Sequence, residues 1–117
     1  MNFKLQQQAL CQRYGVIPYD TSDLLKVGVS RNVSEGVMPL NGLRYAPIGN
    51  TSGWYLWAGE EPSQEDDFFV PLHIYHLYEL APAIVKYLLL PPAWRFLTIP
   101  QQYEDVWYDK DLLSIID

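Results

Sequence analysis

The chain has little cysteine and little positive charge, and each shortage excludes a class of protein. Among its 117 residues Cys11 is the one cysteine, so no internal disulfide framework can form. Lys and Arg number 8 against 14 Asp and Glu, for a formal net charge of −6, and no two of the cations are adjacent. A protein that binds nucleic-acid phosphates usually carries a basic face. We therefore expect neither nucleic-acid binding nor attraction to an anionic membrane.

Long apolar runs are missing as well. The longest, YLLLPPAW at 87–94, is far too short to span a bilayer. The N-terminal MNFKLQQQAL lacks the apolar stretch of a signal peptide. We expect a cytoplasmic protein with no membrane contact.

Patterns that carry catalysis or bind metals are also absent. His73 and His76 stand three positions apart with Glu79 three further on, whereas the zinc-protease pattern needs H-E-x-x-H. The block EEPSQEDD holds its acids in pairs, while a calcium loop needs alternating ligands and a glycine at its sixth position. Neither a G-x-S-x-G elbow nor a phosphate-binding glycine loop occurs. We expect no metal, no cofactor and no enzymatic activity.

What the chain does have is apolar material for a core, since 49% of its residues are hydrophobic and 15% aromatic. Residues 1–117 are expected to form a single domain, with a helical N-terminal extension at 1–25 and a core at 26–117. Helices are predicted over 2–15, 70–80 and 82–90, strands over 24–33, 53–59, 93–99 and 104–109, a loop or ragged hairpin over 34–53, and a closing helical turn over 109–117. This segregated order predicts an α+β fold, with an antiparallel sheet and helices packed on one face.

The stretch SGWYLWAGEEPSQEDDFF, at 52–69, sets an aromatic strand against a block of negative charge. Alternation places Trp54 on one face of the strand with Leu56 and Ala58, and Tyr55 and Trp57 on the other. Both faces are apolar, so the strand is either central or meets a partner. Trp54 is assigned to the core, and Trp57 is the candidate anchor for a partner. The predicted partner-binding residues are Trp57, Glu60, Glu61, Glu65, Asp66 and Asp67.

Several stretches carry a resemblance to a known family: KVGVSRNV, NTSGWYLWAGEE, the following EDD, PLHIYHLYEL, and LPPAWRFL leading into YEDVWYD. From about Val27 onward the chain resembles a bacterial family of small immunity proteins of polymorphic toxin systems, family thirty-three in that scheme. Ser52, Gly53, Trp54, Gly59 and Glu60 match its aromatic strand and the acidic loop after it. Ala93, after two prolines, stands where the family would have glycine, and the first 25 residues lie outside this resemblance.

The resemblance implies a non-catalytic binder that occupies a cognate bacterial toxin domain. Many toxin domains are nucleases with basic clefts, so it also implies a basic partner that the acidic loop would attract. Three alternatives stay open. The aromatic strands could line a small-molecule pocket, or the strand with two apolar faces could form a homodimer. Arg95, His73 and Glu104 could also meet in three dimensions as an enzyme site.

Overall fold

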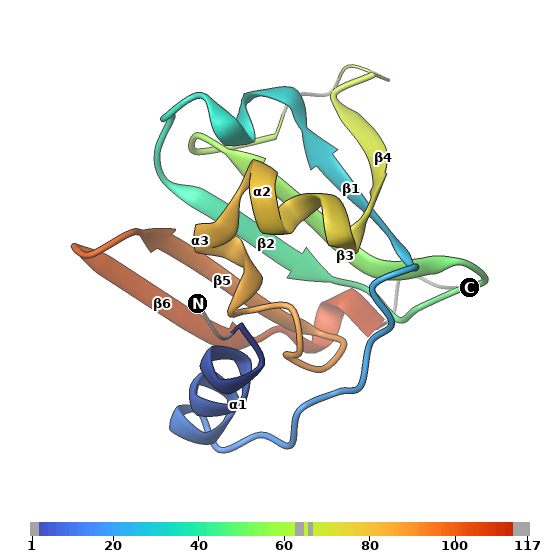
Figure 1. Ribbon diagram of the computed structural model, residues 1–117, viewed down its shortest axis with the longest axis vertical. Helices are drawn as coiled ribbons and strands as arrows, with labels where there is room; N and C mark the ends of the chain where they lie inside the picture. The colour runs from blue at the N-terminus through green and yellow to red at the C-terminus, as the bar shows by residue number, and fades with distance from the viewer. Residues whose placement is uncertain (1–2, 63–64, 66, 114–117) are drawn as a thin grey trace.

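Six strands form one mixed sheet in the order β4-β1-β3-β2-β5-β6 (Figure 1). The computed structural model describes residues 3–62, 65 and 67–113. Neighbouring strands are antiparallel except β1 and β3, which run parallel because β3 enters the sheet between β1 and β2. The predicted α+β class is confirmed, with one parallel pair in a sheet that was expected to be antiparallel throughout. The strands are β1 (Lys26–Ser30), β2 (Leu40–Arg44), β3 (Thr51–Ala58), β4 (Phe69–His73), β5 (Trp94–Ile99) and β6 (Tyr103–Tyr108).

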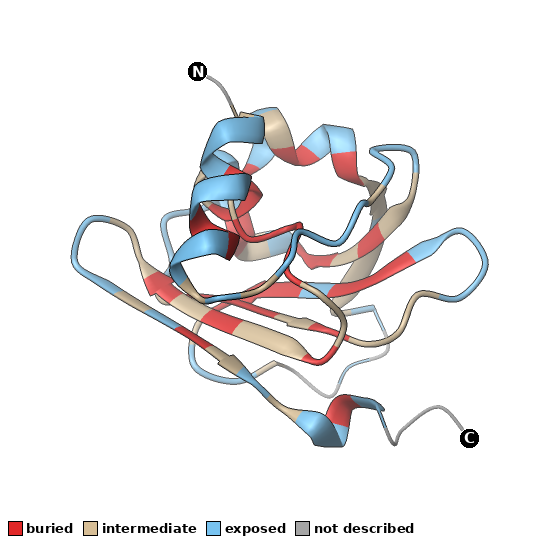
Figure 2. Ribbon diagram, turned by 90° about the horizontal axis from the view of Figure 1, so that it is seen from below, coloured by how far each residue is buried: buried red, intermediate tan, exposed pale blue. Residues whose placement is uncertain are grey.

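The α-helices lie on one face of this sheet, as expected (Figure 2). They are α1 (Phe3–Arg13), α2 (Leu77–Leu80) and α3 (Pro82–Val85), and α2 follows directly on the 3₁₀ turn η2 (Ile74–His76). Two further 3₁₀ turns, η1 (Arg31–Ser34) and η3 (Lys110–Leu113), follow β1 and β6. Over the described part of the chain, no helix has the length and apolarity needed to cross a membrane.

The core lies between the sheet and the helices. Along β3, Trp54, Leu56 and Ala58 face this side and are at most 3% exposed, which confirms the predicted alternation. Trp54 packs 5.8 Å from the ring of Phe96 on β5, and Phe96 stacks on Tyr87 at 4.1 Å between centroids. The other large buried members of the core include Leu10, Val29, Leu40, Ile74, Leu77, Ile84, Leu88, Leu90 and Val106.

Helix α1 closes one end of this core. Leu10 and Cys11 are buried, and this burial raises the pKa of the Cys11 thiol. Gln7 donates from Nε2 to the Val85 carbonyl at 3.0 Å, which joins α1 to α3. Gly15 has φ +72° just beyond the helix, in the conformation of a C-terminal cap.

The segment predicted to be a loop or ragged hairpin, 34–53, contains strand β2, which pairs antiparallel with β3. The hairpin alternative is therefore confirmed, and the loop alternative was wrong. Asn-Gly within LNGLR is typical of a turn, but here Gly42 is needed in the strand. A Cβ at Gly42 would overlap the ring of Phe96 on the neighbouring strand. The glycine therefore makes room for a core aromatic, which its own sequence context does not reveal.

The helix predicted over 70–80 is also wrong in its first half, which is strand β4. Pro71 pairs with Gly28 of β1, and β4 has no neighbour on its other side. An edge strand accepts proline because it has one row of ladder hydrogen bonds to satisfy. Helix α3 ends at Val85, short of the predicted residue 90. Val33, expected on the first strand, lies in η1.

The closing turn at the C-terminal end is η3, where Leu112 is buried and Leu113 is exposed. Ile116, within the turn predicted over 109–117, lies outside the described residues.

Arg44 is 0% exposed and has no carboxylate within reach among the described residues. Its guanidinium donates to three backbone carbonyls, those of Ser52 at 2.9 Å, Leu90 at 2.8 Å and Leu88 at 3.3 Å. It also donates to Thr21 Oγ1 at 3.0 Å. Burial lowers the pKa of Arg44 to about 10, which still leaves it charged at neutral pH. The side chain therefore ties β2 to β3, to the segment after α3 and to the N-terminal segment.

We predict that Arg44→Leu lowers the free energy of unfolding by about 3 kcal/mol or more, because it leaves buried carbonyls without donors. Urea denaturation measures the loss. Arg31→Leu, at an exposed position of η1, is the control and should change stability by less than about 0.5 kcal/mol. Equal losses in the two variants would contradict the role given to Arg44.

Glu104 of β6 is the second polar centre, on the helix side of the sheet. It accepts hydrogen bonds from Tyr87 Oη at 2.6 Å and Tyr14 Oη at 2.8 Å. It also pairs with Arg13 Nη1 at 2.6 Å and Lys86 Nζ at 3.4 Å. Burial alone would raise the pKa of Glu104, but the two tyrosine hydrogen bonds and Lys86 outweigh it and lower the pKa.

A carboxylate whose pKa is lowered by folding stabilises the native state above its unfolded pKa of about 4.3, and this contribution is lost as the pH falls through the folded value. At pH 7 we expect Glu104→Gln to cost about 1–3 kcal/mol. The difference from the parent protein should shrink as the pH falls below this unfolded value and through the lower pKa of the folded state. Thermal unfolding from pH 7 to pH 3 tests this, with the exposed Glu79→Gln as control; a pH-independent difference would refute it.

Candidate functional site

The face of the sheet opposite the α-helices carries a cluster of aromatic side chains. The ring of Tyr55 meets Tyr45 edge-on at 5.6 Å and Phe69 at 5.2 Å. Trp57 meets Phe69 edge-on at 6.4 Å. These rings come from β3, from β4 and from the residue that follows β2. Aromatic rings on a sheet face without helices are a candidate contact surface.

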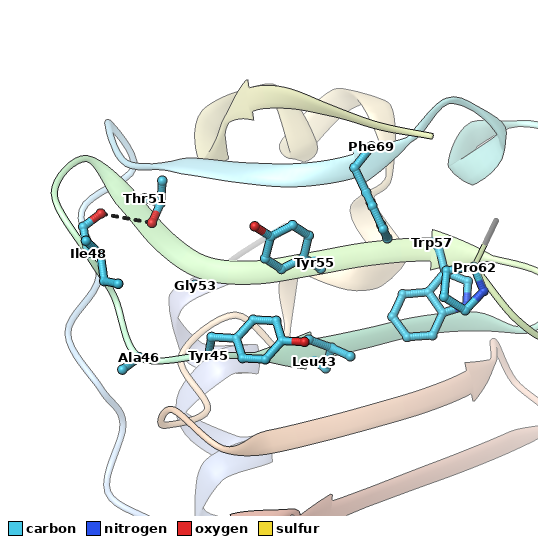
Figure 3. Close-up of a pocket in the computed structure, with 10 residues that line it drawn as sticks. All are labelled: Leu43, Tyr45, Ala46, Ile48, Thr51, Gly53, Tyr55, Trp57, Pro62 and Phe69. Carbon is cyan, nitrogen blue, oxygen red and sulfur yellow. Dashed lines mark hydrogen bonds between the residues drawn. The ribbon is translucent and has the colours of Figure 1, made fainter. Parts of the chain in front are cut away.

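The same residues line a hollow of about 730 Å³ (Figure 3). Tyr45 and Leu43 lie along one side of it, Phe69 lies on the other side and Tyr55 lies between them. Ten residues line it: Leu43, Tyr45, Ala46, Ile48, Thr51, Gly53, Tyr55, Trp57, Pro62 and Phe69. Most of these side chains are apolar, and none is charged.

A bulge at Gly53 shapes this hollow. In the pairing with β1, Lys26 stands opposite Thr51 but Gly28 stands opposite Tyr55, so β3 holds two extra residues between them. Gly53 has φ +91°, and a Cβ there would overlap the carbonyl oxygen of Tyr45. The Tyr45 amide donates to the Gly53 carbonyl at 2.9 Å. Glycine is required because the chain after β2 runs close beside β3 at this point.

The hairpin that follows forms the outer rim of the hollow. Ile48 is 61% exposed, although its backbone is held in place. Its carbonyl accepts hydrogen bonds from both the amide and the hydroxyl of Thr51, each at 3.0 Å (Figure 3). A large apolar side chain is thus presented to solvent on an ordered turn, as is common at contact surfaces.

Trp57 lies on this face, as its alternation in the sequence predicted, but it is only 4% exposed. Trp57 and Pro62 both line the hollow and lie at the same end of it in Figure 3. The indole Nε1 is buried and has no hydrogen-bond partner in the structure described. The more accessible aromatic is Tyr55, at 38% exposure. Sequence reasoning had placed Tyr55 on the same face as Trp57 without assigning it a role.

The acidic loop begins where β3 ends, next to the hollow. Its base is fixed, since the Asn41 amide donates from Nδ2 to the Gly59 carbonyl at 2.6 Å. Pro62 belongs both to this loop and to the lining of the hollow. Of the predicted acidic residues, Glu60, Glu61, Glu65 and Asp67 are exposed, and Asp66 lies outside the described residues.

The structure does not bring the suggested enzyme residues together. His73 lies on β4 and Glu104 on β6, the two opposite edges of the sheet, about 24 Å apart at ~4.8 Å per strand. Arg95 lies on the face opposite to Glu104, where it pairs with Asp109 at 3.1 Å.

The histidines show no metal-binding arrangement either. His73 contacts the Leu24 carbonyl through Nδ1 at 2.9 Å, and its ring lies 5.9 Å from that of His76. Across residues 3–62, 65 and 67–113, no group of three or more His, Cys, Asp or Glu is placed to hold a metal ion.

A family model described as the Imm33-like domain matches residues 6–109. The chain belongs to the Imm33-like family. The match covers every strand of the sheet and begins within α1, further upstream than the motifs that carried the resemblance from Val27. The family's name indicates an immunity-protein type of function. No curated protein and no solved structure matches the chain.

We predict that Gly53→Ala destabilises the fold by at least about 2 kcal/mol more than Gly49→Ala, as judged by chemical denaturation. Both positions have positive φ, but a Cβ at Gly49 meets no atom within 4 Å. The pair therefore separates the cost of backbone conformation from the cost of the close approach of the Tyr45 carbonyl. Equal losses would show that this close approach is not a tight constraint.

Proposed function

We propose that this chain neutralises a cognate bacterial toxin domain by binding it in the cytoplasm, without catalysis. Membership of the Imm33-like family supports an immunity role. The observation that supports the mode of action is the apolar hollow on the helix-free face, with exposed carboxylates at its border. The proposed contact residues are Trp57, Glu60, Glu61, Glu65, Asp66 and Asp67, together with the exposed lining residues Tyr55 and Ile48.

This arrangement has the anatomy of a protein interface. Binding energy is concentrated in apolar anchors that lose water, while charges at the rim guide the encounter. The hollow supplies the apolar centre of the interface, and the acidic loop supplies a rim of negative charge. A basic toxin surface complements this rim, and the carboxylates would compete with phosphate for a substrate cleft. Residues that hold the fold, such as Arg44 and Glu104, take no part in the contact.

Affinity purification of the tagged chain from its native organism, with a moderate-salt wash and mass spectrometry, tests the proposal. We expect one stoichiometric partner, a basic toxin domain, and we expect co-expression of the chain to protect cells from that domain. Recovery of the chain alone or as a homodimer would count against it. A bound toxin that keeps its full activity would refute neutralisation.

Neutralising the loop should change the kinetics of toxin binding. We predict that Glu60→Gln/Glu61→Gln/Asp66→Asn/Asp67→Asn slows association by about tenfold or more at low salt and weakens its salt dependence, because steering depends on these charges. Surface plasmon resonance at two salt concentrations measures both. An unchanged association rate at low salt would disprove the electrostatic role of the loop.

The apolar part of the contact is tested at the rim of the hollow. Ile48→Ala should weaken toxin binding by about 1–2 kcal/mol, since the side chain is exposed in the free protein and would lose water on binding. Ile17→Ala, at a residue that is 85% exposed and does not line the hollow, should leave affinity unchanged. Isothermal titration calorimetry measures the toxin affinity of both variants. Similar affinities would show that the toxin does not contact the rim of the hollow at Ile48. Trp57→Ala is less informative because removing a buried indole also opens a cavity.

The hollow itself supports a second candidate, the binding of a small apolar molecule. Its volume of about 730 Å³ lies within the usual range of ligand pockets. Saturable quenching of tryptophan fluorescence by a fraction of a metabolite extract would favour this function. If no fraction quenches the fluorescence and a toxin domain is bound, toxin neutralisation remains as the function.

A further inference from the structure

The hollow and the acidic loop meet at Trp57 and Pro62, and this junction restricts what can bind. On one side lie uncharged, mostly apolar side chains, including those of Tyr55 and Ile48. On the other side the chain continues into exposed Glu60 and Glu61. A ligand that covers both sides must therefore be apolar at one point and positively charged within a few ångströms of it.

The junction also holds an unused hydrogen-bond donor. The indole Nε1 of Trp57 is buried without an acceptor in the described structure, which is unfavourable for a donor removed from water. A bound group that brings an acceptor to this nitrogen would remove this cost. Carboxylates are poor candidates because the loop beside Trp57 is itself acidic, whereas a backbone carbonyl is neutral.

We propose that the hollow binds a short peptide segment of the partner in which apolar residues are flanked by Lys or Arg. The apolar side chains enter the hollow, and the cations lie opposite Glu60 and Glu61, which directly precede the lining residue Pro62. A backbone carbonyl of the segment accepts a hydrogen bond from Trp57 Nε1. The volume of the hollow is enough for two or three side chains. That the segment belongs to a toxin rests on the proposed function, but its chemistry rests on the hollow and the loop.

Three synthetic peptides with matched lengths test the chemistry without any toxin. They are acetyl-KKFLKK-amide, acetyl-KKSSKK-amide, which lacks the apolar centre, and acetyl-EEFLEE-amide, which reverses the charge. Binding is followed by the indole N–H signals of the four tryptophans in two-dimensional ¹H–¹⁵N NMR. Trp57→Phe assigns the signal of interest.

We expect KKFLKK to bind at least about tenfold more tightly than either control at low salt, because each control lacks one of the two interactions. It should move the Trp57 indole proton downfield, as a new hydrogen bond requires. Equal binding of KKSSKK would overturn the use of the hollow, and equal binding of EEFLEE would overturn the use of the loop. No movement of the Trp57 signal with any peptide would overturn the whole proposal.

A matched pair of variants separates local charge from net charge. Glu60→Gln/Glu61→Gln should weaken KKFLKK binding by about threefold or more. Asp20→Asn/Glu79→Gln removes the same charge from exposed positions of the N-terminal segment and α2, and it should leave binding unchanged. Equal weakening by both pairs would refute a local role for the loop. If the chain binds KKFLKK but no toxin partner is found, this inference stands and the proposed function is contradicted. If a toxin partner is found but KKFLKK does not bind, the proposed function stands and this inference is overturned.

Discussion

The burial of Arg44, with no acid partner among the described residues, is the constraint on which most of this structure depends. A charged guanidinium removed from water must find several oriented acceptors, and here backbone carbonyls supply them. Those carbonyls belong to β3 and to the segment after α3, so the sheet and the helical layer cannot separate without exposing an unpaired charge. Tyr19 and Trp54 lie within 4.8 Å and 5.5 Å of the guanidinium and complete its enclosure. The acceptor on β3 is Ser52, next to the bulge at Gly53, and the same arginine thus supports the strand where the hollow forms.

The two faces of β3 have different roles in the protein. One face fills the core with Trp54 and Leu56, and the helices cover it completely. The other face receives no helix, and the bulge together with the following hairpin turns it into a hollow instead of a flat surface. A sheet that is covered on one side only leaves apolar area in water, which is unfavourable unless a partner or ligand covers it. The chain belongs to the Imm33-like family, whose name indicates an immunity-protein type of function, and binding a partner is consistent with that function.

The carboxylates also fall into two groups, one that is held within the fold and one that is exposed on the surface. Glu104 is surrounded by two tyrosine hydroxyls and two cations, and it joins α1 to the last strand. Glu60, Glu61 and Asp67 stand exposed in the loop that contains Pro62, a lining residue of the hollow. Among the described acids, the half-buried Glu104 thus stabilises the fold, while these exposed acids define the character of one surface.

The sequence by itself determined the local features that depend on neighbouring residues. Alternation along 53–59 predicted which aromatics face the core, and Gly15 marked the end of the first helix; the acidic loop, the α+β class and the family also followed from short stretches.

Tertiary structure decided the features that depend on distant residues. LNGLR is a strand because it pairs with β3 and β5, where Gly42 leaves room for the ring of Phe96. Pro71 lies in a strand because that strand is at an edge. The parallel pairing of β1 with β3 depends on strand order, which no local pattern encodes. Trp57 was assigned to the correct face, but its burial and the hollow around Tyr55 required four segments to come together. Propensity acts over a few residues, whereas a surface is made by whichever segments the sheet places side by side.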